Sequence, residues 1–556
     1  MASRARPRTC SATSASPSRT WSTRRSPCSI DPPGDMTRTV VSPSGVPGSA
    51  LAQGRRDSMG CGAPLILAAV IARKGMRPAG TATSGRLVTD DPVKEDDMSR
   101  KTLTAVNPAN DQVLGEHEML DDAGLADKMN QAREGYAEFR HLPVADRQRR
   151  LTALADLIDQ HQREMAEIIA HEMGKPFHQG IAETQISSAI VRFYADNLES
   201  LLKPQPRQVE GAQKAEIVHD PMGAVLGVMP WNYPLYQVVR FAAPNLAGGN
   251  VCLLKHASNV PGCAKFITKL FHDAGFKEGT FTWLPIGSDK VEGIIHDPLV
   301  CGVTLTGSED AGRAVAKIAG EAIKPSVLEL GGIDPLIVLD DADVDKAVEL
   351  AVNGRFDNTG QSCAASKRLI VERPMLERFT EKLIDRVQKM RIGDPMDGDT
   401  EIGPMSRKDL RDDLHDQVQR AIKHGAQLET GGEVLDRPGA WYAPTVLTNV
   451  APGNPAFDEE LFGPVASVIV ADDAEHAIEL ANNCRYGLGG TVVGQDVKRA
   501  EQVARRLEVG MSFVNRPTTP FAELPFGGVK ESGYGREQSE YGFGAFLNVR
   551  TVYIAE

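Results

Sequence analysis

One cysteine of this 556-residue chain lies in a setting that favours nucleophilic chemistry. The segment Asn358-Thr-Gly-Gln-Ser-Cys363 places a thiol after a glycine-containing turn and among small residues. Such a thiol can be exposed and closely approached, so Cys363 is the best candidate nucleophile, with a packed, inert thiol as the alternative. Cys252 and Cys301 lie within apolar, strand-like runs, and we expect both in the core.

Two other segments carry a polar side chain at the end of an expected strand. Glu329 ends an apolar run just before two glycines. A carboxyl group buried there without a partner would have a raised pKa, which suits a general base. Asn232 stands in Pro230-Trp-Asn-Tyr-Pro234, where its amide could donate to an oxyanion. The alternatives are a salt-bridged glutamate and a turn asparagine that bonds its own backbone.

The segment Thr306-Gly-Ser-Glu-Asp-Ala-Gly312 predicts a strand, a glycine turn and a helix. Gly307, Ser308 and Gly312 would then lie at a helix N-terminus, where backbone N–H groups bind phosphate. The pattern is not GxGxxG, and a single glycine turn is weak evidence of a nucleotide site.

The last segment, Glu459-Glu-Leu-Phe-Gly-Pro464, places a carboxylate two residues before an aromatic ring. Glu460 could hold a sugar hydroxyl while Phe462 packs beside it. Taken alone, the same segment is compatible with an ordinary surface loop.

These segments lie in a chain that alternates between strand-like and helical patterns. Helical periodicity extends from about residue 121 to residue 174. Short apolar runs between helical stretches predict mostly parallel sheets covered on both faces, and hence an α/β fold with two domains. The expected strands are 224–229, 251–255, 300–306, 326–330 and 335–339, followed after the cysteine by 368–371, 465–470 and 512–514.

Composition excludes several classes of protein. There are 62 Lys and Arg against 74 Asp and Glu, a net charge of −12, which argues against broad nucleic-acid binding. The longest apolar run, 63–72, is too short to span a membrane. The cysteines form no CxxC pair, so no zinc or other metal site is predicted. Scattered thiols in a long chain favour a cytoplasmic protein.

Residues 1–97 differ from the remainder in being rich in Ser, Arg, Pro, Thr and Gly. We predict a disordered extension there, because the stretch has too little apolar surface to offset its ordering entropy. An over-extended start, with Met98 as the true initiator, is favoured over a transit peptide; a native flexible tail is the third interpretation.

Together, the chemical segments resemble those of the aldehyde dehydrogenase superfamily in order and approximate spacing. The resemblance covers about Thr102 to Val552. The bacterial succinate-semialdehyde dehydrogenase branch is the most similar, judged on 254–260 and 363–368. The matching motifs are Glu172-Met-Gly-Lys-Pro176, Leu328-Glu-Leu-Gly-Gly332, Gly360-Gln-Ser-Cys363, Glu460-Leu-Phe-Gly-Pro464, Tyr486-Gly-Leu488 and Pro525-Phe-Gly-Gly528.

The resemblance implies a Rossmann-like parallel-sheet cofactor domain, an α/β catalytic domain and a small β oligomerisation flap. The corresponding boundaries are 98–203 and 221–331 for the cofactor domain, 332–531 for the catalytic domain, and 204–220 and 542–556 for the oligomerisation segments. A homodimer or homotetramer is expected, and the alternating segment 214–219 is consistent with a strand that seeks a partner.

The resemblance also implies a mechanism. The Cys363 thiolate attacks an aldehyde, and the oxyanion is held by Asn232 and the Cys363 N–H. Hydride passes to NAD or NADP, and Glu329 activates the water that hydrolyses the thioester. The residues implied to hold the cofactor are Trp231, Lys255, Ser258, Gly307, Ser308, Gly312, Leu330, Glu460 and Phe462.

Departures from the family pattern bear on cofactor and substrate. Ser258 replaces a glutamate common in NAD-preferring members, which favours NADP because no carboxylate repels a 2′-phosphate. His256 could assist there, although a solvated loop histidine is the simpler interpretation. Arg240 matches an arginine that grips the distal carboxylate of succinate semialdehyde, with an arginine paired to a structural acid as the alternative. Asp357 replaces a second family arginine.

Other activities remain open from the sequence. Another semialdehyde or aliphatic aldehyde could be the substrate. A coenzyme A-acylating enzyme is disfavoured by Glu329, which supplies a base for water. A non-redox cysteine hydrolase or acyltransferase is disfavoured by the cofactor residues, and a silent structural protein by the intact set Cys363, Glu329 and Asn232.

Overall fold

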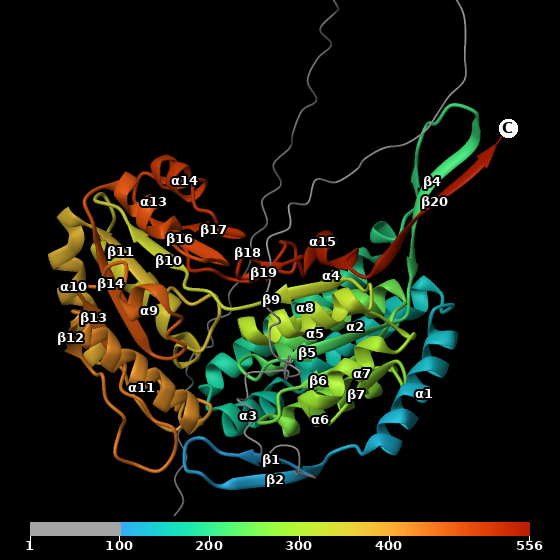
Figure 1. The fold of residues 1–556 in the computed structure, drawn as a ribbon, viewed down its shortest axis with the longest axis horizontal. Helices are drawn as coiled ribbons and strands as arrows, with labels where there is room; N and C mark the ends of the chain where they lie inside the picture. Colours follow the sequence, from blue (N-terminus) through green and yellow to red (C-terminus); the bar gives the residue numbers. More distant parts are fainter. Residues whose placement is uncertain (1–101, 556) are drawn as a thin grey trace, which may run out of the picture. The chain divides into compact units, whose positions relative to one another are not determined.

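The structure is a computed structural model that describes residues 102–555. The predicted disordered extension, with its alternative start at Met98, lies outside the described residues. Among residues 102–555, no helix combines the length and the apolar character that a membrane crossing requires. The expected α/β class is confirmed, with two large sheets flanked by helices (Figure 1).

The first large sheet of the described chain has six strands in the order β19-β9-β8-β5-β6-β7, all parallel except β19. Every residue of β5 and β6 is buried, because helices cover both faces. The strands are β5 (Ala224–Met229), β6 (Val251–His256), β7 (Phe281–Trp283), β8 (Val300–Thr306), β9 (Ser326–Glu329) and β19 (Gly533–Tyr534).

The elements around this sheet come mostly from the first half of the described chain. Helix α5 is buried along its whole length and begins directly after Asn232 and Tyr233. The helices are α1 (Asp122–Phe139), α2 (Val144–Gln160), α3 (Gln162–Met173), α4 (Phe177–Leu201), α5 (Pro234–Gly248), α6 (Pro261–Asp273), α7 (Val291–His296) and α8 (Glu309–Glu321), preceded by the hairpin β1 (Thr102–Val106) and β2 (Val113–Glu118).

The second large sheet has seven described strands in the order β12-β13-β14-β11-β10-β16-β17, parallel except for β12. Its strands are β10 (Pro335–Val338), β11 (Arg368–Glu372), β12 (Gln427–Thr430), β13 (Thr445–Thr448), β14 (Val465–Ala471), β16 (Gly489–Val493) and β17 (Met511–Val514). Its helices are α9 (Val344–Phe356), α10 (Arg373–Gln388), α11 (Lys408–Lys423), α12 (Pro455–Asp458), α13 (Ala474–Asn482) and α14 (Val497–Ala504). The predicted domain boundary after residue 331 falls between β9 and β10, strands of different sheets.

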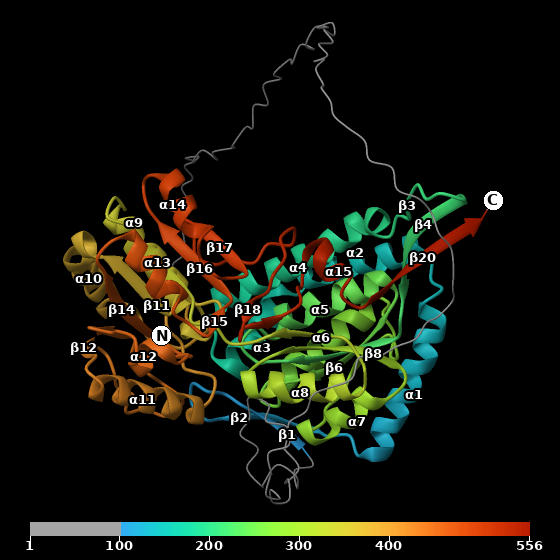
Figure 2. The same ribbon diagram turned by 45° about the horizontal axis from the view of Figure 1, so that its top comes forward.

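A third sheet joins distant parts of the chain. Strand β20 (Leu547–Ala555) pairs antiparallel with β4 (Ala212–Pro221), which also pairs with β3 (Gln205–Pro206). Figures 1 and 2 show β4 and β20 side by side, extending away from the six-stranded sheet. These strands lie where the flap was predicted. Three short elements complete the C-terminal part: β15 (Tyr486–Gly487), β18 (Val529–Lys530) and α15 (Ser539–Phe543).

The topology brings the chemical segments together. Asn232 follows β5, Gly307 follows β8 and Glu329 ends β9, so all three lie at the carboxyl edge of the six-stranded sheet. Cys363 lies just before β11 and Glu460 before β14, at the amino edge of the seven-stranded sheet. The candidate site therefore forms where the two edges face each other.

Candidate active site

One cavity of about 170 Å³ is lined by Cys363, Asn232 and Glu329. Asn232 and Cys363 are more than a hundred residues apart in the sequence. Cys363 also lines a second, larger cavity of about 510 Å³. The thiol is half-buried and stands where the two cavities meet. It can therefore be approached from either side.

The turn before Cys363 is strained and buried. Asn358, Thr359 and Gly360 have φ of 54°, 56° and 73°, which side chains other than that of glycine adopt rarely. Tertiary contacts hold this turn: the Asn358 N–H donates to Gln179 Oε1 at 2.8 Å, and the Gly403 N–H donates to Thr359 Oγ1 at 3.1 Å. The nucleophile is thus presented by a backbone that the surrounding structure fixes.

The side chain of Asn232 is oriented by the same turn. Its Nδ2 donates to the backbone oxygen of Gln361 at 3.1 Å, and Asn358 Nδ2 donates to the backbone oxygen of Asn232 at 2.9 Å. The alternative of a turn asparagine bonded to its own backbone is not the observed arrangement. One hydrogen of the amide remains for an oxyanion beside Cys363.

Glu329 is a buried carboxyl group. It is 2% exposed, and neither carboxyl oxygen has a hydrogen-bond partner among residues 102–555. Burial raises the pKa of Glu329 well above its usual value, with Arg240 opposing that shift and Glu537 adding to it. No ion pair to Glu329 occurs within the described chain at salt-bridge distance, so the salt-bridged alternative is not observed. The group is placed to take a proton from water near Cys363.

Burial also raises the pKa of the Cys363 thiol to about 11, with Lys367 and Arg240 opposing this effect. The other cysteines of the described chain differ in setting. Cys252 is fully buried as expected, whereas Cys301 is only partly buried, so the prediction of a core position for Cys301 was wrong in degree. Cys301 is the second residue of β8, near the amino end of that strand.

A trough made of two adjoining cavities begins beside Cys363. The 170 Å³ cavity shares Trp231, Thr306 and Gly307 with a smaller one of about 30 Å³. Phe462 meets Trp231 edge-on, with ring centroids 5.9 Å apart, and both rings line the larger of these two cavities. Leu330, Ser308 and Glu460 line it as well.

The trough fits a nucleotide. Ser308 caps α8, and Gly307 precedes it, so the helix N-terminus faces the cavity. Gly312 has a packing role, because a Cβ there would lie 2.7 Å from Leu330 Cδ1. In the smaller cavity, the buried Oδ1 of Asn259 has no hydrogen-bond partner among the described residues. A sugar hydroxyl or base amine would satisfy it.

Lys255 lies near the end of β6 and is 5% exposed. It lines the smaller cavity together with Arg407, a residue that the sequence did not single out. Ser258 lies between Ala257 and Asn259, which line this cavity too. The simpler interpretation of His256, a solvated loop histidine, was wrong, because His256 is a buried residue at the end of β6. It is 3% exposed, and Nε2 lies 3.0 Å from the Pro234 oxygen while Nδ1 accepts the Ala257 N–H.

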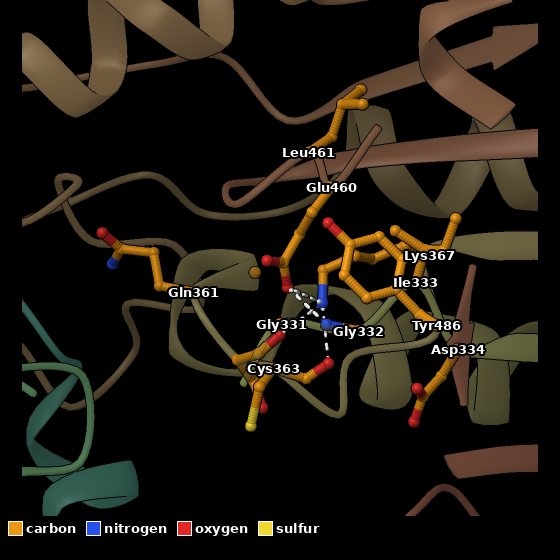
Figure 3. Close-up of polar contacts among 12 residues, drawn as sticks. Gly331, Gly332, Ile333, Asp334, Gln361, Cys363, Lys367, Glu460, Leu461 and Tyr486 are labelled. Atoms are coloured by element: carbon orange, nitrogen blue, oxygen red, sulfur yellow. Dashed lines mark hydrogen bonds and ion pairs between the residues drawn. The ribbon is translucent and has the colours of Figure 1, made fainter. Parts of the chain in front are cut away.

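Glu460 takes part in a polar network that the sequence did not reveal (Figure 3). Its Oε1 lies 3.0 Å from Lys367 Nζ and accepts the Gly332 N–H at 3.1 Å. Lys367 Nζ in turn donates to the backbone oxygens of Ser362 and Cys363 at 2.6 and 2.9 Å. Glu460, the carboxylate predicted to bind the cofactor, is thus linked through Lys367 to the backbone of Cys363.

Arg240 lines the 510 Å³ cavity with Cys363, as a substrate-binding residue would. Its guanidinium is fully buried, forms an ion pair with Glu537 and donates to Thr306 Oγ1 at 2.9 Å. The sequence alternative, an arginine paired to a buried acid, is therefore also realised. Arg516, which sequence reasoning missed because it lies in a loop without a motif, lines the same cavity and stacks on Phe521.

The family model described as the aldehyde dehydrogenase family matches residues 94–552. The chain therefore belongs to the aldehyde dehydrogenase family, and the predicted family, fold class and enzyme class are confirmed.

Three similar proteins all carry the name of one enzyme, succinate-semialdehyde dehydrogenase. The chain is 44% identical over 452 residues to the succinate semialdehyde dehydrogenase (NAD(P)+) of Escherichia coli strain K12, covering 81% of this chain and 97% of that protein. It is 43% identical over 455 residues to a succinate-semialdehyde dehydrogenase (NADP(+)) of Mycobacterium bovis, covering 82% and 100%. The crystal structure of the succinic semialdehyde dehydrogenase of Streptococcus pyogenes with NADP+ matches with a TM-score of 0.80 and 39% identity, covering 82% and 100%.

Proposed function

We propose that this aldehyde dehydrogenase oxidises succinate semialdehyde to the corresponding dicarboxylic acid, with NADP favoured over NAD. The observation that carries the proposal is the place of Cys363 at the junction of two cavities, beside Asn232 and Glu329. One cavity suits a nucleotide, and the other, which Arg240 and Arg516 line together with Glu183 and Asp357, is assigned to an anionic aldehyde. The names of the relatives point to the same substrate.

In the proposed mechanism the Cys363 thiolate adds to the aldehyde carbon. The oxyanion accepts hydrogen bonds from Asn232 Nδ2 and the Cys363 N–H, which are worth most in a site that excludes water. When bound, the nicotinamide would supply the acceptor for the hydride. As the C–H bond of the adduct breaks, its C=O bond re-forms and Cys363 carries a thioester. Glu329 takes a proton from the water that attacks the thioester on Cys363, and the acid leaves as the thiolate is restored.

The residues proposed to hold the cofactor follow the trough. Glu460 accepts ribose hydroxyls near Phe462, and Ser308 with the N-terminus of α8 binds the pyrophosphate. Lys255 and Ser258 hold the adenosine end, supported by the missing carboxylate at Ser258 and the nearby Arg407. Trp231, Leu330 and Gly307 line the walls, and Gly312 packs against Leu330.

We assign the distal carboxylate of the substrate to the 510 Å³ cavity, with Arg240 as the proposed partner. Charge-assisted bonds from a guanidinium suit a carboxylate, and the Arg240 donors are fixed by Glu537 and Thr306. Asp357 lines the same cavity, but its carboxylate accepts the Tyr233 hydroxyl at 2.8 Å. This bond reduces its repulsion of an anion.

We also propose a homo-oligomer, dimer or tetramer, assembled through the flap, and a cytoplasmic location. Strand β20 pairs with β4 along one edge, and its exposed side chains include Val549 and Tyr553. An edge strand with exposed apolar side chains favours pairing with another copy.

The test measures reduced nicotinamide formed with succinate semialdehyde and with butanal, each with NADP and with NAD. We expect a higher kcat/KM for succinate semialdehyde, and a lower preference for it in Arg240→Ala, with butanal as the control. Ser258→Glu should shift selectivity toward NAD. Equal kcat/KM for both aldehydes in the unaltered enzyme would overturn the substrate assignment, and unchanged cofactor selectivity would overturn the role of Ser258.

A further inference from the structure

Lys367 is a buried ammonium group placed between the nucleophile and the cofactor cavity. It is 3% exposed and makes three close polar contacts, to the backbone oxygens of Ser362 and Cys363 and to Glu460 Oε1 (Figure 3). Burying a lysine is costly unless its charge is paired and its protons are bonded. Here two backbone oxygens accept hydrogen bonds from the ammonium and the Glu460 carboxylate pairs with its charge, so the ammonium is held in one place.

Glu460, which forms the ion pair with Lys367, connects this lysine to the cofactor cavity, the cavity of about 170 Å³ proposed to hold the cofactor. Its Oε1 is occupied by Lys367 and the Gly332 N–H, while its side chain lines the 170 Å³ cavity. Gly332 packs against the nucleophile as well, because a Cβ on it would lie 2.8 Å from the Cys363 oxygen. A ligand bonded to Glu460 would therefore act on groups that touch the Cys363 backbone.

Lys367 is not the only tie between the Glu460 loop and the turn that carries Cys363. The loop that carries Glu460 is already tied to the nucleophile turn by Arg355, which donates to the Gly360 oxygen at 3.2 Å and to the Leu461 oxygen at 2.8 Å. Lys367 instead bonds the two carbonyl groups that flank the Cys363 N–H. That peptide group is the proposed oxyanion donor.

We propose that Lys367 is a positioning residue that holds the Cys363 backbone and, through Glu460, transmits the state of the cofactor cavity to the thiol. When a cofactor hydroxyl bonds to Glu460, that carboxylate neutralises Lys367 less, and the positive charge acts more on the thiolate. The second part rests on the proposed function, because it takes Glu460 as the ribose-binding group. The first part, the hold on Cys363, does not.

Four charged groups affect the Cys363 thiol, and they determine which control variants the experiment needs. Lys367 and Arg240 favour the thiolate, whereas Glu460 and Asp334 disfavour it. Lys367 comes from the segment before β11, Arg240 from α5, and Glu460 from the loop before β14. A change at Lys367 should therefore alter thiol reactivity without removing the other cation.

The first experiment measures the rate of Cys363 alkylation by iodoacetamide against pH, without cofactor. Lys367→Met should lower the rate at pH 8 about tenfold, since one pKa unit changes the thiolate fraction by that factor. Lys367→Arg retains the charge and should recover most of the rate. Lys389→Met, an exposed lysine of the same chain, should behave as the unaltered enzyme. An unchanged pH profile in a folded Lys367→Met variant would overturn the proposal.

The second experiment repeats the alkylation with NADP, with binding followed separately by tryptophan fluorescence. Iodoacetamide can enter through the 510 Å³ cavity, so we expect at least a twofold faster reaction in the unaltered enzyme. Glu460→Gln should alkylate faster than the unaltered enzyme without NADP and lose the response to it. This variant tests the link even where Lys367→Met fails to fold.

The outcomes separate the two hypotheses. Absence of NADP and NAD binding would contradict the proposed function but leave the cofactor-free test of Lys367 intact. If Glu460→Gln binds NADP normally and NADP still speeds its alkylation as in the unaltered enzyme, the link from the cofactor cavity to the thiol is refuted. The proposed function would stand.

Discussion

At the scale of single residues, the reactivity of the site depends on one carboxyl group and one thiol. Glu329 and Cys363 both have pKa values raised by burial. Burial therefore favours the uncharged form of each group, and the thiol is the resting form of Cys363 near neutral pH. Each must lose a proton to act, so the charges around them control reactivity.

The first prediction concerns Glu329 as the base for thioester hydrolysis. Glu329→Gln keeps the shape of the side chain but cannot accept a proton. We expect a burst of roughly one reduced cofactor per site followed by a stall, because acylation proceeds and hydrolysis does not. Stopped-flow absorbance of the reduced nicotinamide measures the burst. A full steady-state rate in this variant would rule out the role.

The second prediction is the pH dependence of Cys363 in the free enzyme. Because burial places the thiol pKa at about 11, alkylation by iodoacetamide should rise about tenfold per pH unit from pH 7 to pH 10. The thiolate is lost as the pH falls below the pKa, so the rate falls in that direction. A plateau reached at pH 8 would show that the thiol is far more acidic than its burial implies.

At the scale of elements, buried charges position the helix that leads from Asn232. Glu183 of α4 accepts the N–H groups of Leu235 and Tyr236 at 2.9 and 3.1 Å, which caps α5. It also forms a fully buried ion pair with Lys175. The Lys175 ammonium lies 3.6 Å from the centroid of the Tyr233 ring. The motif that contains Lys175 thus supports the turn that carries Asn232.

The third prediction tests this cap. Glu183→Ala should lower the free energy of unfolding by about 3–5 kcal/mol, because it leaves Lys175 buried without its counter-charge. The double variant Lys175→Met/Glu183→Gln removes both charges and retains a capping oxygen, so it should lose less. Urea unfolding followed by tryptophan fluorescence measures both. If the double variant is the less stable of the two, the pair is not the reason for the loss.

At the scale of the whole molecule, the flap strand β20 is exposed along most of its length. Val549 and Tyr553 are 60% and 47% exposed on β20 and, four residues apart, lie on the same face of the strand. Exposed apolar side chains on an edge strand favour association. The flap is therefore the proposed contact between copies.

The fourth prediction follows from that exposure. Val549→Glu/Tyr553→Glu should reduce the particle mass measured by light scattering, because charges on this face oppose burial against another copy. Val497→Glu, an equally exposed valine on α14, is the control and should leave the mass unchanged. A double variant with the mass of the unaltered protein would exclude the flap as the contact.

Local sequence was sufficient for the strands that lead into the candidate site and for the choice of candidate residues, but it did not predict β7, β12, β13 and β16. The expected strands 224–229 and 300–306 coincide with β5 and β8, because buried parallel strands are continuous apolar runs bounded by turns. Cys363, Glu329 and Asn232 were recognisable because each stands at the end of such a run or beside a glycine turn. Apolar runs and glycine turns are local features, so they can be recognised from neighbouring residues in the sequence.

Only the tertiary structure decided which groups act on one another. Lys367 and Glu460 are far apart in sequence, and Arg240 meets Glu537 from the other end of the chain. The burial of His256 and the partial exposure of Cys301 also depended on which helices and strands cover them. Electrostatic effects act through space, so the pKa values of Cys363 and Glu329 followed from packing that no local pattern contains.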